Sequence, residues 1–395
     1  MGIEFHLGRN DHKVAEDFLT GGHRVVDGIT IEAHNVQRQH EVIEAAQRSA
    51  VPVRIDLLLE RLTNPGFDYG PLPYVRDAGI NKRSLRRSEA ERSRLVDAAL
   101  GFQESVASQL VAPHIFASDG RDDQLVVDLA EKTLRAAGTS DVRVIVAANR
   151  DRLAADDGLA GRELADGLAA IGVASVELRL SPTGDRDMSL NKVRSIFSVV
   201  KDFEDSIQNV VLGYQGILGP AALAAGVSEG FSVGVGLRER YDYSSLRQPR
   251  SSSDSSYGPQ PGVYLPSAGS TVTRRMAAGL FKDSGIRSRL RCPYLCCRGN
   301  IDGPSADPRT HYLVSRTSQL TELLDKPTAW RARMEQQRLL GAVDTANMIN
   351  DGHVPGDTHP IKTRTLKSLI ESSSRTQGQH RERWAPNQSR KLVRI

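Results

Sequence analysis

The chain has 395 residues, of which 39% are hydrophobic and 25% are charged, and its formal net charge is +4. This length can bury a full-sized core, and the composition is not that of a disordered, fibrous or polycationic protein. No apolar run reaches the roughly 20 residues that cross a bilayer, and no basic stretch followed by an apolar one opens the sequence. We therefore expect no membrane segment and no signal peptide.

Eight short apolar runs rich in β-formers recur along the first 245 residues, at 3–8, 28–34, 51–59, 110–117, 142–149, 173–180, 209–215 and 231–237. Segments between them, such as Asp122–Ala137, repeat Leu, Ala and Val with helical spacing. Alternating strands and helices predict parallel pairing, and eight units favour an α/β fold, a (β/α)₈ TIM barrel over residues 1–246. An open doubly wound sheet is the alternative, although no glycine fingerprint follows the first run.

Four segments interrupt or extend this pattern. Residues 60–109 are too long for one crossover, so we expect a loop or lid and then a charged helix. Residues 247–269, rich in Ser, Pro, Gly and Tyr, predict a flexible loop. A helical subdomain over 270–350 and a weakly ordered basic tail over 351–395 are expected to follow. The tail either contacts nucleic acid or is simply a solvated end.

Polar residues stand where the predicted strands end, and in a barrel these ends meet in one cavity. They include His6, Glu32, His34, Asp56, His114, Asn149, Glu177, Arg179, Gln215 and Arg238. Asp56 is the most informative, because apolar neighbours would raise the pKa of its carboxyl and suit it to proton transfer. Its alternative role is structural, in a salt bridge to Arg54 or Arg61.

Gln215 and Gly216 form a second candidate. A glutamine amide can both donate to and accept from a base edge, and a glycine lets a planar ligand approach the backbone. The alternative is an ordinary turn between a strand and a helix.

The three cysteines of the chain, Cys292, Cys296 and Cys297, lie within six positions and are followed by His311. Thiolates and imidazole are the usual tetrahedral zinc ligands, and a site closed by four protein ligands is structural rather than catalytic. We therefore expect a structural zinc in the C-terminal extension. Buried free thiols are the alternative. An odd, clustered set of cysteines is a poor disulfide framework and favours the reducing cytoplasm.

Two motifs add to the barrel and the cysteine cluster. Tyr-Gln-Gly-Ile-Leu-Gly at 214–219 resembles a base-recognising Val-Gln-Gly-Gly run, and residues 230–237 resemble the Gly-Tyr-Ala-Ile-Gly-Gly-Leu strand that follows it. Over about residues 1–345 the chain resembles the tRNA-guanine transglycosylase superfamily. It departs from the family in its zinc-ligand spacing, in the late position of both motifs, and in carrying Asp-Leu-Leu-Leu at 56–59 instead of Asp-Ser-Gly-Gly-Phe-Gln.

The resemblance implies a base exchange at an N-glycosidic bond, in which an aspartate displaces guanine from tRNA or DNA and a 7-deazaguanine then replaces it. Asp56 is the candidate for one catalytic carboxylate, and Asp242 or Glu239 for the other. The candidates for substrate binding are Asn149, Gln215, Gly216, Gly236 and Arg238. Arg83, Arg86, Arg87 and the basic tail are expected to hold phosphates.

Two other functions remain open. In the second, the chain is a catalytically degenerate relative that serves in a modification or antiviral defence system. It would bind a deazaguanine, a nucleic acid or a protein partner, or form a homodimer. A different barrel hydrolase with a coincidental zinc site is the third possibility.

Overall fold

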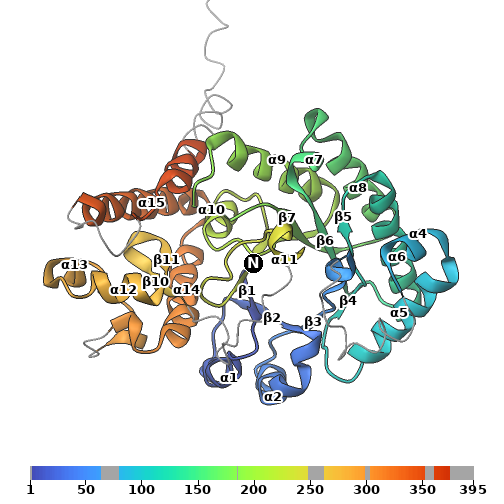
Figure 1. The fold of residues 1–395 in the computed structure, drawn as a ribbon, viewed down its shortest axis with the longest axis horizontal. Helices are drawn as coiled ribbons and strands as arrows, with labels where there is room; N and C mark the ends of the chain where they lie inside the picture. The colour runs from blue at the N-terminus through green and yellow to red at the C-terminus, as the bar shows by residue number, and fades with distance from the viewer. Residues whose placement is uncertain are drawn as a thin grey trace, which may run out of the picture.

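The computed structural model describes residues 2–63, 80–184, 186–247, 262–298, 303–351 and 360–373, and its core is a ring of parallel strands (Figure 1). The strands are β1 (Gly2–Leu7), β2 (Val26–Glu32), β3 (Val53–Asp56), β4 (Leu110–Val111), β5 (Phe116–Ala117), β6 (Val142–Asn149), β7 (Ser175–Ser181), β8 (Asn209–Leu212) and β9 (Gly230–Gly234). Each of the eight predicted runs overlaps one of these strands, and the fourth run covers both β4 and β5.

The strand order identifies the sheet as a nearly closed barrel. Along the sheet the order is β3-β2-β1-β9-β8-β7-β6-β4, and the short β5 also pairs with β6. Neighbours are therefore consecutive in sequence, except that β4 and β5 share one position beside β6 and that β1 pairs with β9. The remaining seam lies between β3 and β4, where the backbone N–H groups of Ser108 and Gln109 donate to the Val53 carbonyl at 3.0 and 3.1 Å. An open doubly wound sheet would reverse its order once and would leave two free edges, so that alternative is excluded.

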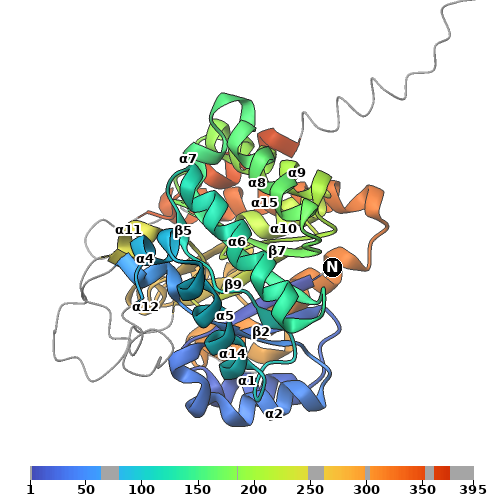
Figure 2. The same cartoon turned by 90° about the vertical axis from the view of Figure 1, so that its right-hand side faces the viewer.

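Helices cover the outside of the ring (Figures 1 and 2). They are α1 (His12–Thr20), α2 (His40–Arg48), α4 (Lys82–Arg87), α5 (Glu89–Gln103), α6 (Gly120–Ala137), α7 (Arg150–Leu153), α8 (Leu159–Ala170), α9 (Leu190–Ser206) and α10 (Leu218–Ala224), with the short α11 (Tyr243–Arg247) after β9. The charged helix expected within 60–109 is confirmed as α5. Residues 64–79, which include most of the predicted lid, lie outside the described residues.

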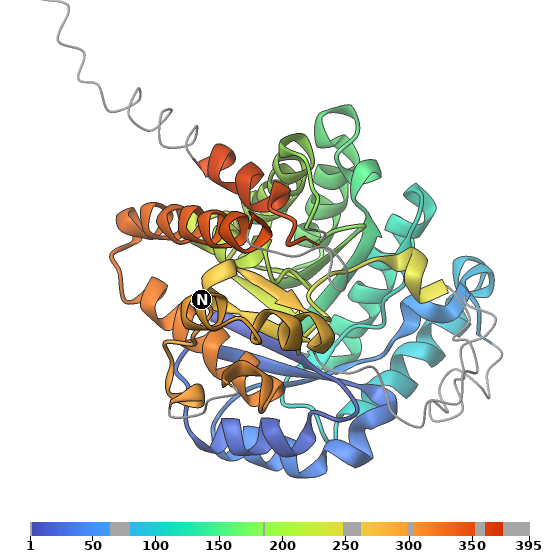
Figure 3. The same ribbon diagram turned by 60° about the vertical axis from the view of Figure 1, so that its left-hand side comes forward.

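The C-terminal extension packs along one side of the barrel (Figure 3). It contains the hairpin β10 (Val263–Leu265) and β11 (Ser270–Val272), then α12 (Arg274–Leu280), α13 (Ser284–Arg289), α14 (Pro308–Leu324) and α15 (Thr328–Asp351). Pro327 separates the last two helices, because proline lacks the N–H that a continuous helix needs. Buried side chains of α14 and α15, among them Tyr312 and Leu339, belong to the same apolar core as the barrel.

Two expectations about order are wrong in part. Residues 263–268 were expected in a flexible loop but form β10 and a 3₁₀ turn, because Gly269 in the left-handed region lets the chain reverse onto β11. Residues 360–373 were expected in a weakly ordered tail, yet 364–373 are helical and bury Leu366 and Leu369. The rest of the expected tail, 352–359 and 374–395, lies outside the described residues, as does 248–261 of the loop.

A buried ion pair joins the extension to the barrel. The carboxylate of Glu239, just after β9, pairs with Arg316 and accepts hydrogen bonds from Tyr312 at 2.8 Å and Thr271 at 2.7 Å. The Arg316 guanidinium also lies 4.2 Å from the centre of the Tyr264 ring. Because all these side chains are buried, removing one charge would leave the other without compensation.

We expect Glu239→Ala to lower the free energy of unfolding by about 3–5 kcal/mol, the usual cost of an orphaned buried charge. Chemical denaturation monitored by circular dichroism measures this change in the free energy of unfolding. The double variant Glu239→Gln, Arg316→Met removes both charges and should regain more than half of the loss. A single variant as stable as the parent would show that the pair does not hold the extension in place.

Candidate active site inside the barrel

The inside of this barrel is charged, whereas barrels are usually filled by branched apolar side chains. Strand alternation points every second residue inward, and at these positions the sequence is polar. The inward-facing polar set, all of it buried, comprises Glu4, His6, Thr30, Arg54, Asp56, Arg143, Glu177, Arg179 and Ser232. At the N-terminal end Glu4 pairs with Arg54 and Arg143, at 3.0 and 2.9 Å. The remaining groups form a second cluster nearer the mouth.

Arg179 is the centre of the mouth cluster. Its guanidinium lies 2.7 Å from Asp56, 3.2 Å from Glu177 and 3.6 Å from Glu60, each distance joining a nitrogen to a carboxylate oxygen. Burial alone would lower the pKa of Arg179, but Asp56 and Glu177 together raise it well above its ordinary value. The guanidinium is therefore a permanent positive charge that holds these carboxylates as anions.

Asp56 is fully buried and ionised. Burial would raise the pKa of its carboxyl, but Arg179, His114 and His6 outweigh burial and lower that pKa to about 2. The expectation of a raised pKa is therefore wrong, because the sequence gives the apolar neighbours along β3 but not the arginine that faces it from β7. Its ion-pair partner is Arg179 rather than Arg54 or Arg61.

Glu60 and His114 complete the mouth cluster. The Nε2 atom of His114 lies 2.8 Å from a Glu60 oxygen and 3.7 Å from Asp56. The three residues offer ligand atoms within 4.8 Å of one another, a grouping that can hold a metal ion. However, Arg179 already supplies positive charge to both carboxylates, which disfavours a second cation there.

Two strained residues border this cluster. Leu58 and Tyr214 have φ of +56° and +55°, a region that residues with side chains rarely adopt. The turn at Leu58 directs its N–H onto the Asp56 carboxylate at 2.9 Å. The turn at Tyr214 stacks its ring on His6, with ring centres 4.1 Å apart, and the Arg179 guanidinium lies 5.2 Å from the same ring centre. Such strain is typical of functional sites, where the surrounding contacts maintain it.

Glu177 links β7 to β1 and β9. One of its oxygens lies 3.0 Å from His6 Nε2 and accepts a hydrogen bond of 3.0 Å from the Ser232 hydroxyl. Burial would raise the pKa of Glu177, but Arg179 and His6 lower it well below its ordinary value. Three carboxylates thus meet one arginine and two imidazoles in a single buried cluster.

Several predicted site residues have other partners. Asn149 is exposed and caps α7 by accepting from the Arg152 N–H at 3.1 Å, and Asp242 likewise accepts from the Ser244 N–H at 3.0 Å. Glu239 lies in the ion pair that holds the extension. Among the described residues, none of these three side chains hydrogen-bonds or pairs with the mouth cluster, which argues for structural roles.

The remaining predicted substrate-binding residues lie around the same end of the barrel. The Gln215 amide donates to Thr183, and its buried Oε1 has no hydrogen-bond partner among the described residues. Gly216 lies so close to Glu239 that a Cβ atom would be 2.5 Å from its carboxylate oxygen. Gly236 has φ +74°, which only glycine adopts easily. Arg238 pairs with Glu32.

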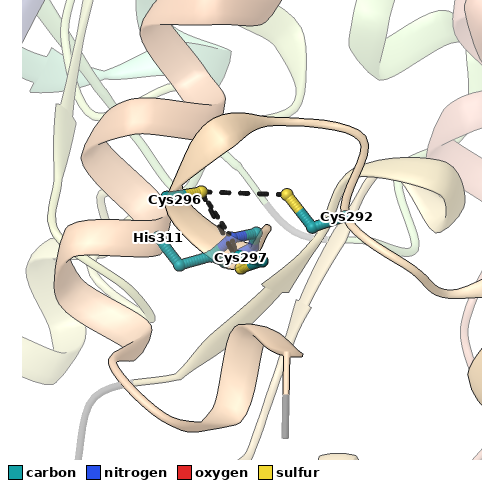
Figure 4. A group of neighbouring side chains, drawn as sticks. All are labelled: Cys292, Cys296, Cys297 and His311. Carbon is teal, nitrogen blue, oxygen red and sulfur yellow. Dashed lines mark hydrogen bonds between the residues drawn. The ribbon is translucent and has the colours of Figure 1, made fainter. Parts of the chain in front are cut away.

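The cysteine cluster is a separate grouping in the extension (Figure 4). Cys292 Sγ is 3.8 Å from Cys296 Sγ, which is 3.8 Å from Cys297 Sγ. His311 Nδ1 is 3.5 Å from Cys296 Sγ and 3.3 Å from Cys297 Sγ. These four residues can hold a metal ion, and the other ring nitrogen of His311 donates to the Tyr264 carbonyl at 2.7 Å.

Comparisons with known proteins do not assign this chain to a family. No protein-family profile matches it, and no curated protein matches its sequence. Among the solved structures that match is the crystal structure of TcOYE with pHBA, at 9% identity and a TM-score of 0.36. That match covers 59% of this chain and 84% of the other, and it is too distant to carry an argument. None of the described helices combines the length and apolar character that a bilayer crossing requires.

Glu60 is the site residue that the sequence analysis missed. It stands four residues after Asp56, beyond the end of β3, in a 3₁₀ turn (Leu59–Thr63) where no strand periodicity points to it. The feature of the sequence that could have identified Glu60 is its position as a carboxylate four residues after a strand-end aspartate.

The depressed pKa of Asp56 predicts a pH-dependent stability. In the unfolded chain this carboxyl titrates near 3.8 and in the folded protein near 2, so its contribution is complete above pH 4 and is lost as the pH falls toward 2. The difference corresponds to about 2 kcal/mol. Asp56→Asn should therefore lose less stability than the parent between pH 4.5 and 2.5, as measured by urea denaturation at each pH. If the free energy of unfolding fell equally with pH in the two proteins, the lowered pKa of Asp56 would be contradicted.

Proposed function

We propose that this protein is a transglycosylase-like enzyme that exchanges a base at an N-glycosidic bond of a nucleic acid, with Asp56 as the nucleophile. The main support is the Asp56–Glu60 pair, whose oxygens lie within 4.8 Å of each other in one buried cluster. Retaining glycosidases hold their two carboxyl groups about 5–5.5 Å apart for a covalent double displacement. The cluster lies at the C-terminal strand ends, where barrel enzymes hold their active sites.

The two carboxylates share Arg179 and His114 as charged neighbours but differ in their hydrogen bonds. Arg179 and the Leu58 N–H donate to Asp56, whereas Glu60 is the carboxylate bonded to His114, and this difference gives the two groups separate roles. Asp56, ionised beside Arg179, would attack the anomeric carbon as the bond to guanine breaks. The departing base would take up the proton shared between His114 and Glu60, which lie 2.8 Å apart. The incoming 7-deazaguanine would return a proton to this pair as its nitrogen displaces Asp56. Glu60 thus replaces Asp242 and Glu239 as the proposed second carboxylate.

The surroundings of Asp56 also suit a flat heterocycle. Tyr214 and Tyr241 are buried beside the cluster, with ring centres 5.9 Å apart, and the hydroxyl of Tyr241 has no hydrogen-bond partner among the described residues. Together with Gln215 Oε1, it offers a polar group to a base edge next to aromatic faces. A base would have to leave its stack to reach this position.

One observation favours the alternative of a degenerate binding subunit. Both oxygens of Asp56 already accept hydrogen bonds, one from Leu58 and one from Arg179, as expected of a carboxylate kept for structure. Such a protein would bind a deazaguanine, nucleic acid or partner protein without breaking a bond.

For the cysteine cluster we propose a structural zinc ion. A tetrahedral site with zinc–sulfur bonds of about 2.3 Å and zinc–nitrogen bonds of about 2.0–2.1 Å has edges of about 3.8 Å between sulfurs and about 3.5 Å between sulfur and nitrogen. The four measured separations, 3.8, 3.8, 3.5 and 3.3 Å, fit this geometry. The backbone carbonyl that accepts from His311 would orient the imidazole, as outer partners of metal ligands usually do.

The base-exchange proposal predicts that protein incubated with guanine-labelled tRNA or duplex DNA, together with a 7-deazaguanine, releases labelled guanine. Asp56→Asn keeps the shape of the side chain but removes the nucleophile, so the rate should fall on the order of a thousandfold or more. Asp242→Asn is the matched control and should stay within a few-fold of the parent, because Asp242 serves as a helix cap.

A folded Asp56→Asn variant that retains the parent rate would exclude Asp56 as the nucleophile. If the parent releases no label from either nucleic acid but binds 7-deazaguanine, the degenerate subunit becomes the supported function.

The zinc proposal predicts about one equivalent of zinc in protein purified without added metal, measured by elemental analysis. His311→Ala should retain less than half of this zinc and unfold at a lower temperature, because metal binding stabilises the folded state. His40→Ala, at an exposed histidine of α2, is the control and should change neither quantity. Purified protein without zinc but of full thermal stability would contradict the proposal.

A further inference from the structure

A basic groove on the outside of the barrel is lined by residues of α4, α5 and α6. Figure 2 shows these three helices side by side. Its volume is about 690 Å³, and Asp128 is the one acidic residue among those that line it. The cations that line it are Lys82, Arg83, Arg86, Arg87, Arg92 and Arg121. The groove is a separate feature from the mouth cluster, although Lys82 bonds the Phe116 carbonyl at the mouth end of β5.

Half of these cations are already neutralised by the fold. Lys82 and Arg86 both pair with the buried carboxylate of Asp122, and Arg92 lies 3.8 Å from Asp128. These contacts fix α4 against α6 and define the wall of the groove. The three paired cations therefore shape the groove, and its net positive charge comes from the other three cations.

Arg83, Arg87 and Arg121 are exposed, and no described residue makes an ion pair or side-chain hydrogen bond with their guanidinium groups. Arg83 and Arg87 are four residues apart on α4, where like charges repel across one helical turn. Arg121 is in the first turn of the 18-residue α6, where the helix dipole disfavours a cation. A bound polyanion would relieve the repulsion between Arg83 and Arg87 and would offset the unfavourable position of Arg121 at the start of its helix.

We infer that this groove binds the phosphate backbone of a nucleic-acid strand and holds the substrate whose base enters the barrel. The inference deepens the proposed function, on which it relies for the identity of the polyanion. Arginine is well suited to this role, because its planar guanidinium donates two parallel hydrogen bonds to phosphate oxygens. Three arginines with no partner among the described residues supply attraction that is independent of base sequence, as backbone contacts do.

The test is the salt dependence of binding. A protein that neutralises Z phosphates loses affinity with a slope of about −0.7Z for single strands in a plot of log K against log salt. The triple variant Arg83→Ala, Arg87→Ala, Arg121→Ala should therefore reduce the slope by about 2 and weaken binding of a fluorescent 20-nucleotide RNA or DNA strand at least tenfold in 50 mM KCl. Fluorescence anisotropy measures both quantities on the full chain.

The matched control removes three exposed cations from another part of the surface: Lys282→Ala, Arg287→Ala, Arg291→Ala, in and beside α13. In Figure 1, α13 lies on the opposite side of the molecule from α4. This control changes net charge equally and should leave the slope within about 0.5 of the parent. Both variants keep residues 374–395, so a difference between them belongs to the groove rather than to the basic tail.

Equal salt slopes for the parent and the groove variant would overturn the inference. Binding of polyglutamate as tightly as the nucleic-acid strand would also overturn it, because it would indicate an acidic protein partner. The outcome is distinguishable from failure of the proposed function. A protein that binds strands through the groove but releases no guanine supports this inference and contradicts base exchange. Guanine release unchanged in the groove variant contradicts the inference alone.

Discussion

The interior of this barrel depends on one buried arginine. Arg179 lies where (β/α)₈ barrels usually have branched apolar side chains. It faces Asp56, Glu60 and Glu177 at nitrogen–oxygen distances of 2.7 to 3.6 Å. Without it, three carboxylates in a space closed to water would repel one another and would have to take up protons. The same arginine that makes the charged core tolerable also keeps Asp56 ionised, so stability and proposed chemistry share one physical cause.

The polar groups of the chain divide between the barrel interior and contacts that hold the fold together. Carboxylates that point into the barrel pair with buried arginines there, Glu4 at the N-terminal end and the others in the mouth cluster. Glu239, after β9, instead binds Arg316 and fixes the C-terminal extension. Asp242 and Asn149 serve as helix caps because each stands immediately before a helix whose first N–H groups need an acceptor. A strand-end position alone therefore does not identify an active-site residue, and the direction of the side chain must be known.

The extent to which the sequence predicted this site follows from the range of each interaction. Asp56, His114 and Arg179 were found as polar residues in apolar runs, because period-two alternation is a local property. The pKa of Asp56 was predicted in the wrong direction, because its controlling partner is 123 residues away on β7. Glu60 was missed because a 3₁₀ turn has no alternation from which an inward direction can be inferred.

By itself the sequence determined the eight strand–helix units, the clustered cysteines and histidine, and the polar character of the strand ends, since all of these are patterns of neighbouring residues. Only the tertiary structure decided that β1 closes onto β9, which charges neutralise one another inside the ring, and that three of the six groove cations have no partner among the described residues. Pairing between charges depends on which strands and helices face each other in space. That arrangement results from burying the whole apolar surface at once, and no short stretch of sequence encodes it.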